Sequence, residues 1–146
     1  MRVRILAVGT RMPGWVTTAY EDYVRRMRAA LRIDLEEIPV GRTKADEEKK
    51  LLERIGDDYL VALDERGKSL TTLQLAEWLG ERQQDGRNLS FAIGGPDGLG
   101  PGILARATLR WSLSALTFPH AMVRVILAEQ LYRAHTVLQN HPYHRE

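Results

Sequence analysis

The stretch SFAIGGPDGLGPG, residues 90–102, joins an apolar run to five glycines, at positions 94, 95, 98, 100 and 102. Glycine has no Cβ, so a glycine-rich loop after a strand lets a flat ligand lie directly on the main chain. The same composition is typical of a tight turn, and the sequence leaves both interpretations open. No Lys-Ser or Lys-Thr pair follows and the spacing differs from the dinucleotide fingerprint, so neither a P-loop nor a Rossmann site is predicted.

A second candidate loop, residues 114–120 (SALTFPH), precedes the last predicted helix. Pro119 restricts Phe118 to an extended conformation. An extended segment offers amides and carbonyls in alternation, which suits the edge of an adenine because that edge needs a donor and an acceptor. The alternative is that the segment is only a strand end followed by the entry to a helix.

The last predicted helix, Ala121–Gln139, is apolar on more than one side. Such a helix is expected to be buried against its own sheet or also against a second chain. Within it, Glu129 and Arg133 lie four residues apart, in the order that favours a salt bridge on a helix surface.

The tail NHPYHRE, residues 140–146, is unusual in composition for a chain end. Pro142 prevents the preceding helix from continuing. Beyond it, Tyr143 offers a stacking face, His144 a titratable nitrogen and Arg145 a fork that binds phosphate. Two histidines without a set of carboxylates do not predict a metal site.

Charge is distributed unevenly although the net charge is only +2. Residues 1–33 carry seven arginines against two acidic residues, residues 34–100 carry 9 basic and 15 acidic residues, and residues 101–146 carry five arginines against two glutamates. Arginine suits phosphate because its fork bonds two oxygens at once. The basic ends therefore favour nucleic acid as a partner, while a basic surface kept for solubility is the alternative.

Apolar strands and amphipathic helices alternate along the chain. The predicted strands are Val3–Val8, Ile33–Ile38, Tyr59–Leu63, Leu89–Ile93 and Trp111–Leu116. The predicted helices are Trp15–Leu31, Ala45–Ile55, Thr72–Gln83, Ile103–Thr108 and Ala121–Gln139, with Thr71 as an N-cap. This alternation predicts a single α/β domain over residues 1–146, with a mostly parallel five- to six-stranded sheet and helices on both faces.

Ligands of open α/β sheets bind beyond the carboxyl ends of the strands. Three junctions follow apolar strands in this way: Leu63-Asp64, residues 93–96 and residues 114–120. We expect them to meet at one edge of the sheet and to form a binding site.

The chain has no cysteine and no apolar run long enough to span a membrane. Its first residues, MRVRILAVGT, do not read as a signal peptide. We therefore expect a cytoplasmic protein without disulfides.

Three stretches, IGGPDGLG, WSLSALTFPHAMVRVILAEQLYRA and NHPYHRE, closely resemble the RlmH family of small SPOUT-class methyltransferases. AVGTRMPGWV and LDERGK also match, so the resemblance covers essentially the whole chain. It implies a homodimer with a C-terminal trefoil knot, S-adenosylmethionine as cofactor, and methylation at N3 of a pseudouridine in large-subunit (23S) ribosomal RNA. The cofactor-binding residues that it implies are Leu63, Gly94, Gly95, Ser114, Ala115, Leu116, Thr117, Phe118 and Pro119.

The resemblance also implies roles for the last helix and the tail. A sulfonium donor is already activated, so the enzyme has to position the acceptor and remove its N3 proton. His144 and Glu129 are the candidate catalytic groups for that proton, with water as the alternative. Arg133 and Arg145 are expected to hold phosphates, and Tyr143 to stack on a splayed base, in the tail's own chain or across the dimer. No metal is required.

Two other functions remain open at this point. One is a non-catalytic ribosome- or RNA-binding protein of the same fold, and the other is a SPOUT enzyme that acts on tRNA ribose. A domain this small offers little surface for RNA, so the assembled ribosome is the expected form of the ribosomal RNA substrate.

Overall fold

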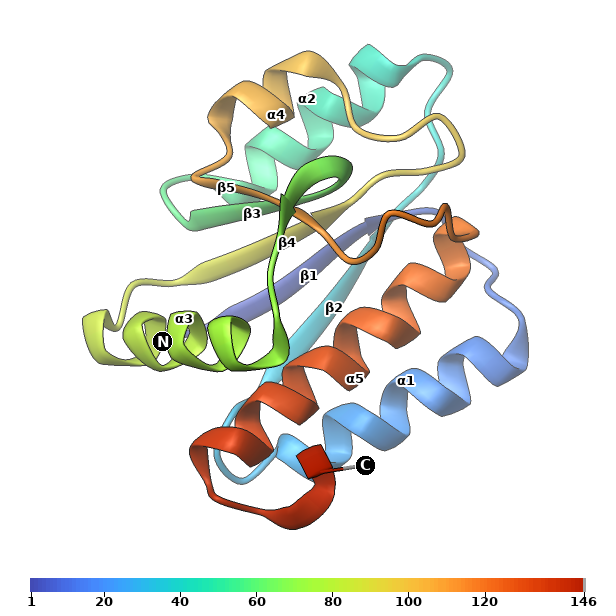
Figure 1. Ribbon diagram of the computed structural model, residues 1–146. Helices are drawn as coiled ribbons and strands as arrows, with labels where there is room; N and C mark the ends of the chain where they lie inside the picture. Colours follow the sequence, from blue (N-terminus) through green and yellow to red (C-terminus); the bar gives the residue numbers. More distant parts are fainter. Residues whose placement is uncertain (146) are drawn as a thin grey trace.

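The computed structural model describes residues 1–145, and Glu146 lies outside the described residues. Five strands form one parallel sheet in the order β2-β1-β4-β3-β5 (Figure 1). They are β1 (Val3–Val8), β2 (Ile33–Ile38), β3 (Tyr59–Ser69), β4 (Leu89–Ile93) and β5 (Leu109–Ser112). The predicted parallel α/β sheet is confirmed.

Helices cover both faces of the sheet (Figure 1). On one face lie α1 (Gly14–Met27), α3 (Thr72–Asp85) and α5 (His120–Leu138), and on the other lie α2 (Lys44–Ile55) and α4 (Pro101–Arg106). A short 3-10 helix, η1 (Pro142–Arg145), contacts α5. No helix within residues 1–145 is long and apolar enough to cross a bilayer.

Apart from the buried Arg4 and Ser90, the central strands β1 and β4 are apolar because both of their faces are covered. Successive side chains of a strand point to opposite faces, so Ile5 and Phe91 join the core under α1, α3 and α5. Leu6 and Ala92 join the second core under α2 and α4. This explains why β1 and β4 read as continuous apolar runs rather than alternating patterns.

Two strands differ from the sequence-based expectation. β3 continues to Ser69 because Lys68 and Ser69 pair again with β5 after residues 64–67 bulge out of the ladder. Gly67 permits this return, since a Cβ there would lie 2.6 Å from the Arg110 carbonyl. β5 ends at Ser112 rather than at Leu116, because the Ser112 hydroxyl donates to the Ser114 carbonyl at 2.9 Å and turns the chain away from the sheet.

Helix ends also shift by a few residues. The predicted cap at Thr71 is confirmed, with a reciprocal bond between its backbone and the Gln74 side chain. The helix predicted over Ile103–Thr108 instead begins at Pro101, because proline at the first turn has no amide hydrogen to leave unpaired.

Candidate active site

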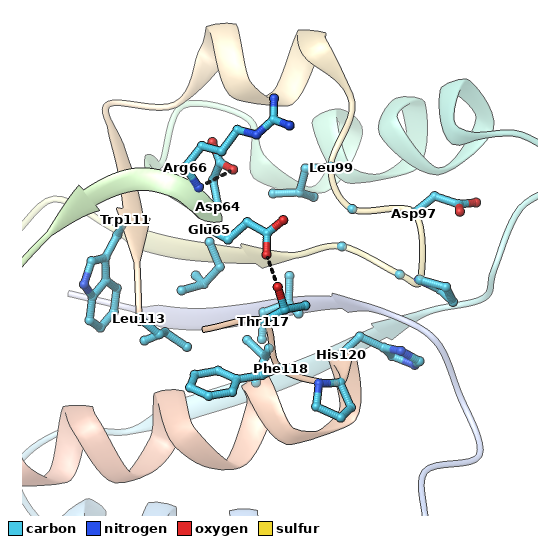
Figure 2. A pocket seen from close by; sticks show the side chains of 18 of the residues that line it. Asp64, Glu65, Arg66, Asp97, Leu99, Trp111, Leu113, Thr117, Phe118 and His120 are labelled. Carbon is cyan, nitrogen blue, oxygen red and sulfur yellow. Dashed lines mark hydrogen bonds between the residues drawn. The ribbon is translucent and has the colours of Figure 1, made fainter. Parts of the chain in front are cut away.

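A cavity of about 750 Å³ opens at the carboxyl edge of the sheet (Figure 2). Its walls come from the end of β3, from the glycine loop after β4 and from the loop that joins β5 to α5. Eight of the nine predicted cofactor residues line it: Leu63, Gly94, Gly95, Ser114, Leu116, Thr117, Phe118 and Pro119. Ala115 is not one of the lining residues and is exposed in the same loop. The three junctions therefore meet at one edge, as predicted, in a space that suits a small ligand.

The glycine loop is a tight turn that also forms a cavity wall. The Gly98 amide donates to the Gly95 carbonyl at 3.0 Å, and Gly98 has a φ of 76° that favours glycine. A Cβ on Gly94 would lie 2.5 Å from the carbonyl carbon of Gly98, and a Cβ on Gly95 would lie 3.1 Å from a methyl group of Val8. Close backbone contact therefore requires glycine at position 94, whereas at position 95 a side chain would crowd the Val8 methyl group.

The loop after β5 is shaped by its own side chains. The Leu116 amide donates to the Ser114 hydroxyl at 3.0 Å, and the Thr117 hydroxyl donates to the Glu65 carboxylate at 3.0 Å. The second bond ties this loop to the bulge of β3 (Figure 2). Side-chain hydroxyls of serine and threonine thus hold this loop in place of a strand partner.

Arg124 anchors the start of α5 to the ends of two strands. Its side chain is only 2% exposed, and it pairs with Glu37 at 2.6 Å. It also donates to the Gly9 carbonyl at 2.7 Å. A buried guanidinium needs such partners, because an unpaired buried charge is strongly destabilising. The bonds fix the helix that follows the cavity loop relative to β1 and β2.

The tail lies at the opposite end of α5 from the cavity. None of Glu129, Arg133, Tyr143, His144 and Arg145 lines the cavity. Figure 1 shows the tail folded back at the far end of α5, while the first residue of that helix, His120, lines the cavity. A helix of 19 residues extends about 28 Å. A single chain therefore does not bring the predicted catalytic residues to the predicted cofactor site.

Tyr143 holds the tail on α5. Its ring lies 4.6 Å from that of Tyr132, and its hydroxyl donates to Glu129 at 3.0 Å. Burial, together with hydrogen bonds to Tyr23 and Glu129, raises the pKa of Tyr143 above its usual value, so the phenol stays protonated. His144 is partly buried beside this contact.

Glu129 is fully engaged within the chain. It forms the predicted i,i+4 salt bridge with Arg133 at 3.0 Å and accepts a further bond from Gln130 at 2.7 Å. The hydrogen bond to Glu129 is the largest cause that raises the pKa of Arg133. These donors make the Glu129 carboxylate an anchor for the tail in this conformation.

Comparison with known proteins now decides the family. A family model described as a predicted SPOUT methyltransferase matches residues 1–144. The chain is 51% identical to the "Ribosomal RNA large subunit methyltransferase H" of Alkalilimnicola ehrlichii, over 99% of both chains. The protein of the same name from Thioalkalivibrio sulfidiphilus is 48% identical over the whole of both chains. The chain belongs to the RlmH family of SPOUT methyltransferases.

Solved structures support the fold of this RlmH-family chain. A probable methylase family protein from Haemophilus influenzae aligns with a TM-score of 0.63 over 97% of this chain and 69% of that one, at 17% identity. The tRNA (m1G37) methyltransferase of Aquifex aeolicus aligns with a TM-score of 0.52 over 90% of this chain and 70% of that one, at 12% identity. Identities this low support the shared fold alone.

The cavity of this RlmH-family chain contains polar side chains to which the sequence analysis gave no role, although it named Asp64 as part of a strand-end junction. Asp64 accepts two bonds from Arg110, through Nε at 3.3 Å and Nη2 at 3.0 Å, and Glu65 accepts from Thr117. The stretch LDERGK directly after a strand was the available signal for the two carboxylates. Arg124, which does not line the cavity but anchors α5 beside it, had a signal too, since a single arginine interrupts the apolar run AMVRVILA.

Proposed function

We propose that this protein is an S-adenosylmethionine-dependent methyltransferase that acts on N3 of a pseudouridine in large-subunit ribosomal RNA. The observation that carries the proposal is the cavity at the carboxyl edge, lined by eight of the nine residues that the family resemblance implies. The names of full-length relatives near 50% identity give the substrate class.

The cavity fits the cofactor in size and in chemistry. Its volume of about 750 Å³ lies in the range of small-molecule sites. Leu63, Leu116 and Phe118 offer apolar surface, while the glycine loop and residues 114–119 offer backbone donors and acceptors. S-adenosylmethionine supplies a methyl group on a sulfonium, which needs no further activation. The residues of the chain therefore act mainly by holding the acceptor nitrogen in line and excluding water.

A homodimer completes the proposed site. Met122, Val125 and Ile126 are only half-buried on α5, so this helix has apolar surface left for a second chain. The tail of one chain then lies beside the cavity of the other, where His144 receives the proton from N3, Tyr143 stacks on the target base, and Arg145 with Arg133 binds phosphate. The trefoil knot implied by the resemblance belongs to the same proposal.

The proposed substrate is the ribosomal RNA of an assembled ribosome, which places the protein in the cytoplasm. In the test, the protein and labelled S-adenosylmethionine are incubated with one RNA substrate at a time. The four substrates are ribosomes, large subunits, bare ribosomal RNA and tRNA. We expect label in large-subunit RNA, with the fastest transfer on assembled ribosomes. Label in tRNA alone, or cofactor binding without transfer to any RNA, contradicts the proposal and favours one of the two alternatives.

A further inference from the structure

We infer that loops beside the cavity form a docking surface for a single-stranded RNA loop. This surface, the basic rim, consists of Arg11 and Trp15 around the β1–α1 loop and Arg42 and Lys44 around the β2–α2 loop. All four residues are exposed. The inference rests on the proposed function and specifies which residues hold the RNA at the edge of the cavity and beside it.

Arg11 has a backbone conformation that arginine rarely adopts. Its φ is 58°, and within residues 1–145 only Asn140 shares a positive φ among the non-glycine residues. Glycine adopts this conformation without strain, whereas a side chain is disfavoured there. Strained residues of this kind concentrate at functional sites, where the side chain is worth more than the lost stability. Arg11 makes no hydrogen bond or ion pair within the described residues, so its guanidinium is open to a ligand.

The loop that carries Arg11 is fixed at its base. The Gly9 amide donates to the Ile38 carbonyl at 2.6 Å, and the Gly9 carbonyl accepts from the buried Arg124. Because Arg124 is held by Glu37 as well, the loop is tied to β2 and to α5. Arg11 is therefore presented from a rigid base, which lowers the entropy lost on binding.

The rim adjoins the cavity. A Cβ on Gly9 would lie 3.9 Å from Nε2 of His120, and His120 lines the cavity. On the other loop, Lys44 lines the cavity directly. Figure 1 shows the β1–α1 loop beside the start of α5, and His120, the first residue of α5, lines the cavity. A base inserted into the cavity would leave its flanking phosphates within reach of this surface.

The chemistry of the rim matches RNA. The three cations, Arg11, Arg42 and Lys44, have no carboxylate partner within the described residues, and cations in this state favour phosphates. Trp15 is 56% exposed at the first turn of α1, and an exposed indole is a platform for an unstacked base. A second copy of this chain is a poorer occupant, because a two-fold interface would bring like charges together.

The decisive variant is Arg11→Gly, which removes the charge and relieves the strained φ. We expect an unchanged or higher Tm and unchanged cofactor affinity, together with a KM for ribosomes raised by about tenfold. Arg11→Lys should recover most of the loss. The matched control is Arg28→Ala, because Arg28 is also exposed but lies at the other end of α1. It should leave the KM unchanged.

Salt dependence provides a second measurement. In binding assays with large-subunit RNA, Arg11→Gly should lower the slope of log K against log salt by about 0.7 to 0.9, the effect of one phosphate contact. Trp15→Ala should weaken binding with the slope unchanged. Wild-type KM and slope in both variants would overturn the inference, as would dissociation of either variant into monomers by light scattering. RNA binding that depends on Arg11 but occurs without any methyl transfer would overturn the proposed function and leave the rim supported.

Discussion

The Thr117 hydroxyl donates a hydrogen bond to the Glu65 carboxylate at 3.0 Å, and this bond joins two walls of the cavity. Thr117 belongs to the loop that leads into α5, and Glu65 belongs to the bulge within β3, 52 residues earlier in the chain. The bond restricts the cavity loop before any ligand arrives. A loop that is already ordered loses less entropy on binding.

Removing this bond should weaken cofactor binding. One hydrogen bond contributes about 1 kcal/mol, so Glu65→Ala should raise the Kd for S-adenosylmethionine about fivefold. Glu65→Gln keeps an acceptor and should stay close to wild type. Titration calorimetry measures both variants. Equal affinities for the alanine and glutamine variants would show that the bond does not order the loop.

The glycine loop should tolerate no side chain at Gly94. Gly94→Ala places a methyl group where the Gly98 backbone lies, so the loop must move and cofactor affinity should fall by at least about tenfold. Gly95→Val should abolish cofactor binding, because Val8 already fills the space beside Gly95. Gly80→Ala is the control, since its new methyl would meet only a Leu138 methyl group at 3.4 Å and alanine favours a helix. Wild-type affinity in a folded Gly94→Ala protein contradicts this account of the loop.

The tail should matter for catalysis more than for cofactor binding. His144→Ala should lower the single-turnover rate on ribosomes by at least about tenfold, roughly 1.4 kcal/mol in the barrier. Its cofactor affinity should not change. A near-normal rate would leave water as the remaining proton acceptor, since Glu129 is already held by donors within the chain.

Mixed dimers should reveal whether the tail acts across the interface. A Gly95→Val chain, which should not bind the cofactor, keeps its tail, and a chain lacking residues 143–146 keeps its cavity. If the tail serves the partner's cavity, mixing the two inactive proteins should restore roughly a quarter of wild-type activity, because half of the dimers then carry one complete site. If the tail serves its own cavity, no activity returns. Deletion of residues 143–146 should also lower stability by about 1 kcal/mol or more, because Tyr143 packs on Tyr132.

Acid should destabilise the fold partly through His135. Burial lowers the pKa of His135 below its usual 6.5, so the folded state favours the neutral ring. Above about pH 6.5 the ring is neutral in both states and leaves the free energy of unfolding unchanged. As the pH falls below that value, the unfolded chain binds a proton at His135 more readily than the folded chain does, so the free energy of unfolding decreases. Urea unfolding between about pH 7.5 and about pH 5.5 measures this effect. His135→Gln should flatten the pH dependence, and an unchanged dependence would exclude His135 as a cause.

The sheet and the cavity were readable from the sequence, whereas the strand ends and the tail were not. Apart from Arg4 and Ser90, β1 and β4 are apolar on both faces, so their boundaries follow from composition alone. The return of β3 at Lys68 depends on the contact between Gly67 and Arg110, which are distant in the sequence. The separation of His144 from the cavity depends on the length and direction of α5, and no local pattern encodes that relationship.

The most direct test of the central claim is the position of the methyl group on the RNA. Ribosomes treated with the protein and S-adenosylmethionine are digested, and mass spectrometry locates the modified nucleoside within large-subunit RNA. We predict one pseudouridine methylated on the base at N3, present with the wild-type protein and greatly reduced with His144→Ala. A methyl group on a ribose, on another base, or on tRNA instead of large-subunit RNA would contradict the account.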